Sequence, residues 1–264
     1  MRPKLHLAAT FVAILALSSL TKRVEQLLWV SPLTTRSSHR RAMDPNLGLA
    51  DVAGATDGEA AIAVEPWRQR LQRASDLSRS VKGGNFVQIA TVDKEGLPHC
   101  RTVVFRGFLS GSRGEAMRMI TDARSEKVTQ VQHSPACEMV WWFGLSSEQF
   151  RIGGELQLVG AEGTAFAASE ELQTARFEQW KKLSDAAREQ FWWTQPGTDY
   201  SLSASRKAND YKVGDPETGI PPPDNFLMML LWPREVKYLR LTDNFAQLDE
   251  LDSSGGWTAR RVNP

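Results

Sequence analysis

Short strand patterns separated by turn sequences follow one another from Phe86 onward, and they limit the fold more than any other property of this 264-residue chain. Phe86–Val92 is rich in apolar and β-branched residues, and Asp93–Gly96 then offers a hairpin turn into His99–Phe108. Gln149–Val159 alternates apolar and polar side chains, as a half-buried antiparallel strand does. Further strands are predicted at Met117–Thr121, Cys137–Phe143, Phe226–Trp232, Val236–Leu241 and Trp257–Val262. Strands in hairpin order predict a closed or partly closed antiparallel barrel.

A few helices are expected between these strands. Pro66 followed by Trp67, Leu71 and Ala74 at helical spacing predicts a first helix of about three turns. Helices are also predicted from about Asp122 to His133, after Ser169, and over about Asp185–Trp193. The polar stretch 198–225 is long for a loop of a compact domain, and such a stretch is a lid, a partner-binding arm or disordered. The sequence therefore predicts an α+β, mainly β protein with peripheral helices.

The first 64 residues are predicted to lie outside the folded domain, which would span residues 65–264. Met1–Leu20 has two basic residues ahead of a short apolar run, which describes a signal peptide better than a membrane span of about 20 apolar residues. Residues 21–42 are rich in Arg, Ser and Thr like a transit peptide, and residues 44–64 read as a disordered linker. This layout predicts import into an organelle, with the plastid favoured over the mitochondrion. The alternatives are secretion and a membrane-tethered N-terminus.

Charge and composition exclude several classes of function. The formal net charge is +1, from 32 basic and 31 acidic residues, so the chain lacks the basic excess that nucleic-acid binding needs. Cys100 and Cys137 are the two cysteines and the four histidines are scattered, so neither a disulfide framework nor a metal site is expected. Cys100 is expected to be a buried, inert thiol rather than a reactive one. Gly153-Gly154 is predicted to be a bulge or close-approach point within a strand.

Two neighbouring segments carry residues that suit an anion. In Arg101–Arg106, strand alternation sends the two arginines to opposite faces unless a bulge or twist intervenes. In Thr121–Lys127, a strand ends and a helix begins, so backbone N–H groups, hydroxyls and two cations converge as a phosphate monoester requires. Taken singly, the first segment also fits two solvated edge arginines, and the second fits an ordinary capped helix start.

Five motifs occur in order along the chain. Residues 101–108 read Arg-Thr-Val-Val-Phe-Arg-Gly-Phe, and residues 121–127 read Thr-Asp-Ala-Arg-Ser-Glu-Lys. They are followed by Trp141–Phe143, Glu148–Gly154 and Arg261–Pro264. Together these motifs resemble a branch of the pyridoxamine 5'-phosphate oxidase-like FMN-binding family. The resemblance runs from about Trp67 to the last residue and implies an antiparallel split β-barrel.

Carried onto this sequence, the resemblance implies FMN as the cofactor. The implied contacts are Arg101, Thr102, Val103, Val104, Arg106, Thr121, Arg124, Ser125, Lys127 and Gln149. The first two segments would hold the phosphate and the ribityl chain, while Gln149 would hydrogen-bond the isoalloxazine ring from the other subunit or the opposite barrel wall. Family members are homodimers with FMN at the subunit interface. Trp141 and Trp142 are candidates for that interface, with plain core packing as the alternative.

The resemblance also implies a reaction, the oxidation of pyridoxamine or pyridoxine 5'-phosphate to pyridoxal 5'-phosphate by hydride transfer to the flavin, which O₂ reoxidises. Two departures bear on the substrate. The oxidases have Arg-Lys where this chain has Glu126-Lys127, and Arg124 stands one turn earlier as a replacement charge. They also have an Arg-x-His pair for the substrate where this chain reads Arg240–Asn244. The alternative is therefore an FMN-binding protein without vitamer oxidase activity: a flavin carrier, a sensor or a reductase of another substrate.

Overall fold

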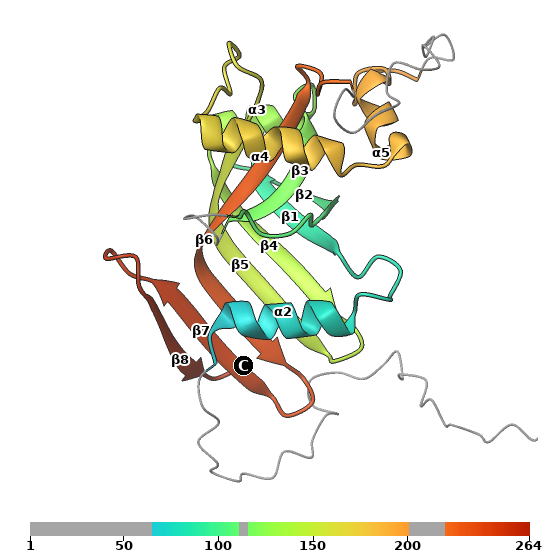
Figure 1. Ribbon diagram of the computed structural model, residues 1–264. Coiled ribbons are helices and arrows are strands. Elements are labelled where there is room, and N and C mark those ends of the chain that lie inside the picture. The colour runs from blue at the N-terminus through green and yellow to red at the C-terminus, as the bar shows by residue number, and fades with distance from the viewer. Residues whose placement is uncertain (1–64, 111–115, 201–219) are drawn as a thin grey trace, which may run out of the picture. The chain divides into compact units, whose positions relative to one another are not determined.

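The computed structural model describes residues 65–110, 116–200 and 220–264. In this part of the chain eight strands form one antiparallel sheet in the order β2-β1-β4-β5-β6-β7-β8, and β3 pairs with β6 (Figure 1). The strands are β1 (Phe86–Val92), β2 (Pro98–Val104), β3 (Met117–Asp122), β4 (Ala136–Phe143), β5 (Glu148–Val159), β6 (Phe226–Arg240), β7 (Phe245–Leu251) and β8 (Trp257–Val262). The helices are α2 (Trp67–Leu77), α3 (Glu126–His133), α4 (Glu170–Lys181), α5 (Asp185–Glu189) and the 3₁₀ helix η3 (Gln190–Trp192). The antiparallel, mainly β prediction is confirmed. The predictions for residues 1–64 and 201–219 lie outside the described residues.

The β1–β2 hairpin forms as its turn sequence predicts. Asp93 accepts hydrogen bonds from the backbone N–H groups of Glu95 and Leu97, and Gly96 takes the positive φ of +82° that such a turn needs. The hairpin register then places Arg101 opposite Ile89. The register of the whole strand pair therefore follows from one short turn.

Strand β2 ends at Val104, whereas the sequence predicts a strand as far as Phe108. The reason lies at Arg106-Gly107, where Gly107 has a φ of +104°. Arg118 of β3 accepts a hydrogen bond from the N–H of Arg106 and donates its own N–H to the carbonyl of Gly107. Two residues therefore oppose one, as in a β-bulge, and the segment after β2 lies along β3 without forming a regular strand.

Strand β6 is one strand of 15 residues, not the two that the sequence predicts. Pro233 has no N–H to donate, and it lies at a register shift opposite Gly153-Gly154 of β5. A side chain at position 154 would place its Cβ 2.1 Å from the carbonyl oxygen of Trp232, so glycine is required there. The predicted bulge or close approach at Gly153-Gly154 is thus confirmed. On its other edge, β6 pairs with β3 before this point and with β7 after it, and the sheet splits there.

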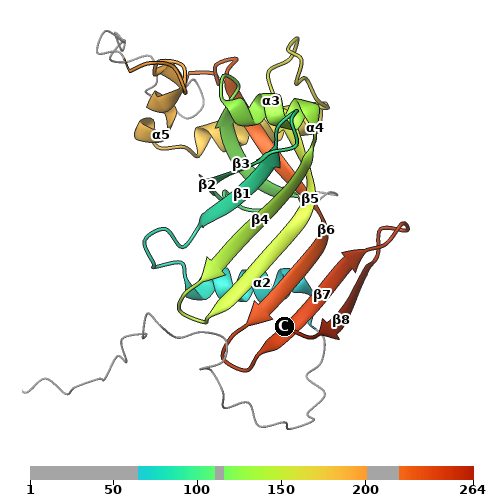
Figure 2. The ribbon, with the colours of Figure 1, turned by 180° about the vertical axis from the view of Figure 1, so that it is seen from behind.

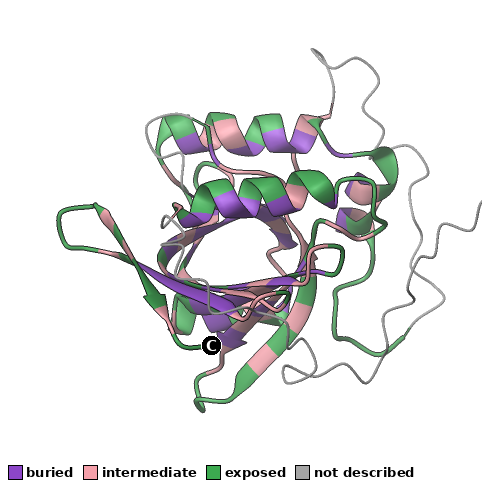
Figure 3. Ribbon diagram, turned by 90° about the horizontal axis from the view of Figure 1, so that it is seen from below, coloured by how far each residue is buried: buried purple, intermediate pink, exposed green. Residues whose placement is uncertain are grey.

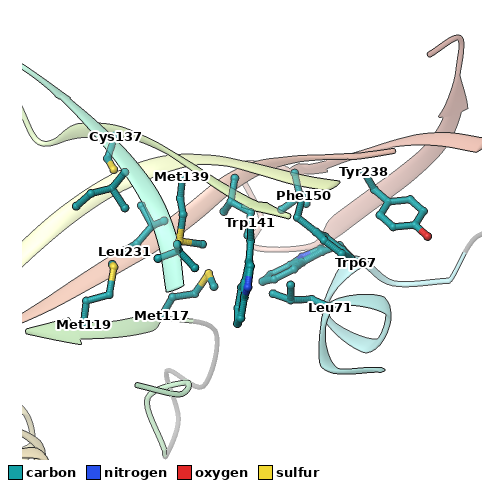
Figure 4. Packing of buried hydrophobic residues seen from close by; sticks show 14 of the residues in the cluster. Trp67, Leu71, Met117, Met119, Cys137, Met139, Trp141, Phe150, Leu231 and Tyr238 are labelled. Carbon is teal, nitrogen blue, oxygen red and sulfur yellow. The ribbon is translucent and has the colours of Figure 1, made fainter. Parts of the chain in front are cut away.

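The main core lies between the sheet and helix α2. Trp67, Leu71 and Ala74 are buried at the helical spacing that the sequence predicts, and Trp67 and Leu71 point toward Trp141 of β4 (Figure 4). The helix faces that turn toward the sheet carry the buried residues, and the outward faces are exposed (Figure 3). The residue before α2 is a proline that makes no side-chain cap, and Asp249 of β7 accepts a hydrogen bond from the N–H of Trp67 instead.

A second layer of helices lies at the other end of the sheet from α2, where α3 and α4 are found (Figures 1 and 2). Trp180 of α4 packs with Leu183, Phe191 and Phe226, which joins the α4–η3 segment to the start of β6. Arg176 of α4 is buried and donates from Nε to the carbonyl oxygen of Phe226 over 3.0 Å. None of the helices among the described residues has the length and apolarity to cross a membrane.

Candidate functional site

Three polar side chains meet where β3 ends and α3 begins. Thr121 Oγ1 and Ser125 Oγ lie 3.1 Å apart, and Lys127 Nζ donates to each of them over 3.1 Å. Ser125 precedes α3, but its hydroxyl makes no cap hydrogen bond to the helix; it donates to the carbonyl of Asp122 over 2.7 Å. The hydroxyl groups and the ammonium group therefore cluster at a helix start, where free backbone N–H groups and the helix dipole favour an anion.

Arg101 adds a second cation, and we call these four residues (Arg101, Thr121, Ser125 and Lys127) the β3–α3 corner. Burial lowers the pKa of Lys127 below its usual range, and the nearby charge of Arg101 lowers it further, although Asp122 and Glu126 oppose this. Among the ion pairs within the described residues, none includes Arg101 or Lys127. An anion bound here would relieve the repulsion between two partly buried cations, so the corner is built for a phosphate-like group.

Arg106 lies at the bulge after β2 and is not hydrogen-bonded to the β3–α3 corner within the described residues. The guanidinium of Arg118 lies over its peptide, with Nη2 3.5 Å from the carbonyl oxygen of Arg106. The Nε atoms of both arginines are buried without a hydrogen-bond partner, and burial lowers the pKa of both groups. No carboxylate of the described residues pairs with either one. Unpartnered donors of this kind are costly unless a ligand satisfies them.

Arg124 turns away from the corner. It forms a two-point ion pair with Asp122, with Nε–Oδ1 at 2.9 Å and Nη2–Oδ2 at 2.6 Å. It also donates to the carbonyl oxygens of Phe191 and Trp193 over 3.2 and 3.0 Å. Arg124 is therefore occupied in fastening the η3 segment to the end of β3. Its predicted contact with FMN stays a prediction, since Nε, Nη1 and Nη2 of Arg124 already donate to these partners.

Gln149 lies far along the sheet from the corner. It pairs with Leu239 of β6, twelve residues beyond Leu227, which is the partner of Thr121. At about 3.3 Å per residue the two points are roughly 40 Å apart along the strand. Gln149 lines a separate cavity of about 350 Å³, together with Leu239 and the C-terminal residues Val262–Pro264. Within one chain, the corner and this cavity therefore lie near opposite ends of β6.

The remaining predicted residues have distinct positions on β2 and β4. Val103 packs against the main core, while Thr102 is exposed and Val104 is half-buried. Strand β4 alternates between buried and more exposed positions: Trp141 is 1% exposed and Trp142 is 43% exposed. Trp141 is therefore a core residue, whose indole N–H donates to the carbonyl oxygen of Gly84 over 3.0 Å. Trp142 remains available to a partner.

The turn between β6 and β7 contains another arginine, Arg240. Arg240 donates from Nε and Nη2 to the two carboxylate oxygens of Asp243, over 2.9 and 2.6 Å. The guanidinium lowers the pKa of the Asp243 carboxyl, so this acid stays ionised and the pair stays closed. Arg240 is thus neutralised within its own turn.

Two residues that sequence reasoning missed hold Arg101 in place. Arg101 Nη1 donates to Thr91 Oγ1 over 2.6 Å, and Nη2 donates to Gln130 Oε1 over 2.8 Å. Both could have been found, because Thr91 is the diagonal neighbour of Arg101 in the hairpin and Gln130 is three residues after Lys127 on α3. The prediction that Cys100 is buried is wrong, because Cys100 is exposed. Cys137 is the buried one, and burial raises its pKa to about 12.

The chain is similar to known proteins in both sequence and structure. Residues 64–160 match the family model described as pyridoxamine 5'-phosphate oxidase, FMN-binding domain. The Arabidopsis thaliana pyridoxine/pyridoxamine 5'-phosphate oxidase 2 is 30% identical over 205 residues, covering 76% of this chain and 98% of that protein. A Hyphomonas neptunium pyridoxine/pyridoxamine 5'-phosphate oxidase is 27% identical over 198 residues, covering 73% and 81%. The crystal structure of an FMN-binding protein related to pyridoxamine 5'-phosphate oxidase, from Nostoc punctiforme, superposes with a TM-score of 0.66 at 35% identity, covering 77% of this chain and all of that one.

The split sheet and its anion-binding corner are those of an FMN-binding split-barrel protein. The residues present fit the cofactor, because the corner offers two cations, two hydroxyl groups and no paired carboxylate to a terminal phosphate. The chain belongs to the pyridoxamine 5'-phosphate oxidase-like family, and FMN is its cofactor.

Proposed function

We propose that this protein oxidises pyridoxamine or pyridoxine 5'-phosphate to pyridoxal 5'-phosphate. The observation that carries the proposal is the identity of 30% to the Arabidopsis oxidase over nearly its full length. Bound FMN would accept a hydride from the substrate and be reoxidised by O₂. The chain itself would hold the FMN phosphate through the β3–α3 corner and Arg106. It would also fix the substrate over the flavin ring.

The test is an anaerobic titration of the FMN-loaded protein with each vitamer. The expected result is bleaching of the flavin absorbance by pyridoxamine or pyridoxine 5'-phosphate and its return on admission of air. A flavin that stays yellow with every vitamer contradicts the proposal. It would favour the second candidate, an FMN-binding protein that acts as a carrier, a sensor or a reductase of another substrate.

One observation favours that second candidate. Arg240 and Asp243 form a closed ion pair at the position where the oxidases carry an Arg-x-His pair for the substrate. An arginine already neutralised by its own turn has little charge left for a substrate phosphate. The two candidates therefore differ in whether this turn opens when a vitamer binds.

We also propose that the FMN site is completed by a second copy of the chain. The corner and Gln149 are roughly 40 Å apart along β6, so one flavin can contact both only if they come from different subunits. The exposed Trp142 on β4, next to Gln149 on β5, supplies an aromatic contact of the kind that interfaces favour.

Subunit mixing tests this arrangement. Arg101→Ala/Lys127→Ala damages the corner, and Gln149→Trp fills the ring cavity. In a mixed dimer, one of the two sites receives both defects and the other receives neither. Mixing the two variants is therefore expected to restore FMN binding to half of the sites in the mixed dimers, which is about a quarter of all sites in a random equimolar mixture. No recovery would contradict a shared site.

We also propose that the N-terminal targeting segment directs the protein to the plastid. Residues 1–64 fused to a fluorescent protein are expected to direct it into plastids. Secretion of the fusion protein would overturn this proposal.

A further inference from the structure

The guanidinium of Arg101 is held between two neutral oxygen atoms. Thr91 Oγ1 accepts from one nitrogen and Gln130 Oε1 from another, and the Thr91 hydroxyl in turn donates to Gln130 Oε1 over 2.6 Å. Thr91 is 0% exposed and Gln130 is 6% exposed, so both acceptors are fixed by packing. The three side chains come from β1, β2 and α3 and form one closed hydrogen-bonded set.

Neutral acceptors of this kind distinguish Arg101 from the arginines that are held by an acid close in sequence. Arg124, Arg188 and Arg240 each pair with an aspartate close in sequence. A carboxylate would satisfy a half-buried guanidinium better than an amide oxygen does, because charge-assisted hydrogen bonds are the stronger ones. Stability of the protein alone would therefore favour glutamate over glutamine at position 130. The amide fixes the direction of the guanidinium and leaves its charge available.

We propose that Gln130, supported by Thr91, is a positioning residue for the cofactor, which directs Arg101 toward the FMN phosphate without neutralising it. The inference rests on the proposed contact between Arg101 and that phosphate. Gln130 itself lies behind Arg101, on the buried face of α3, and acts through it. Because Gln130 sets the direction of the Arg101 guanidinium, a substitution at Gln130 should alter the binding of FMN although Gln130 does not touch it.

The test is Gln130→Glu, which keeps the shape of the side chain and adds a charge next to Arg101. The flavin-free protein is expected to melt at the same temperature as the wild type or higher. Its FMN dissociation constant is expected to rise roughly 10- to 100-fold, the range that one charge-assisted hydrogen bond supplies. Riboflavin, which lacks the phosphate, is expected to bind both proteins alike.

Thr129→Glu is the matched control, since it adds the same charge to α3 one residue earlier on an exposed position. It is expected to change the FMN dissociation constant less than about threefold, because an exposed charge is screened. Gln130→Met serves as a second variant that removes the acceptor without adding charge. It is expected to weaken FMN binding several-fold and to leave riboflavin binding unchanged.

The outcomes separate the inference from its premise. If Gln130→Glu and Gln130→Met bind FMN as tightly as the wild type while Arg101→Ala binds weakly, Gln130 does not position Arg101 and the inference is wrong. Equal losses for FMN and riboflavin would show a merely structural role and would also overturn it. If Arg101→Ala itself binds FMN normally, the proposed phosphate contact fails, and the inference fails with it for that different reason.

Discussion

The β3–α3 corner and the β6–β7 turn both present arginine side chains, but they treat the positive charge in opposite ways. In the corner, Arg101 donates to a hydroxyl and an amide, and Lys127 donates to two hydroxyls. In the turn, Arg240 is bound by both oxygens of Asp243. The positive charge of the corner is not neutralised by a carboxylate and is available to a ligand, whereas the charge of Arg240 in the turn is neutralised by Asp243. The comparison suggests that anchoring of the cofactor and recognition of a substrate are separate properties in this chain.

The largest effect is expected from removing both cations of the corner. Arg101→Ala/Lys127→Ala should weaken FMN binding by roughly 10²- to 10⁴-fold, since each charged hydrogen bond contributes about 1.5–3 kcal/mol. A fluorescence titration with FMN measures the loss, and riboflavin serves as the control ligand without a phosphate. Unchanged FMN affinity would remove the corner from the cofactor site and erase its difference from the turn.

An intermediate effect is expected from opening the turn. Asp243→Asn frees Arg240, and adding Thr242→His recreates an Arg-x-His sequence. If the protein is a vitamer oxidase, this double variant should lower the KM for pyridoxine 5'-phosphate by about tenfold, because a freed guanidinium gains a charge-assisted contact. The FMN dissociation constant should stay the same, since the corner is untouched. A change in FMN affinity instead of KM would show that the two regions are not independent.

A smaller, graded effect is expected from pH. The pKa of Lys127 in the flavin-free protein lies below the unfolded value of 10.5, so between these two values the unfolded chain binds more protons than the folded one. In that window the stability of the flavin-free protein should rise with pH. FMN affinity should fall over the same window by up to about tenfold per pH unit, because the ammonium loses its charge. Lys127→Arg, which stays charged, should show neither trend; a sloping profile in that variant would assign the effect to another group.

The smallest effect on FMN is expected from Arg124→Ala. Its guanidinium is committed to Asp122 and to two carbonyls of the η3 segment. The variant should lose about 1–2 kcal/mol of stability in thermal unfolding, while its FMN dissociation constant changes less than about threefold. A loss of FMN affinity on the scale of Lys127→Ala would place Arg124 in the corner after all.

The sequence predicted those parts of the molecule that local patterns determine. The turn Asp93–Gly96 sets the β1–β2 register, and Gly153-Gly154 marks the bulge that the structure contains. Thr121, Ser125 and Lys127 meet because they lie within seven residues across one strand end and one helix start. Such features depend on neighbours in the chain, and neighbours are visible in a sequence.

Features that depend on distant partners escaped prediction. Strand β7 was missed, since Phe245–Leu251 contains acidic residues and loses its alternation, yet five of its residues are buried by pairing with β6 and packing under α2. The role of Arg124 is equally hidden, because its carbonyl partners lie more than sixty residues away. Two predicted strands merged into β6 because β5 pairs along its whole length and tolerates Pro233 at the bulge.

The long strand β6 also sets the order in which this molecule can be assembled. Thr121 has its strand partner in Leu227, more than a hundred residues later, and β5 is paired along its whole length with β6 as well. Nearly the entire polypeptide must therefore be synthesised before β3, which leads into the β3–α3 corner, can pair with β6. Such late, long-range closure slows folding, and it leaves β3 and β5 of the newly made chain without their partner strand until β6 has been synthesised.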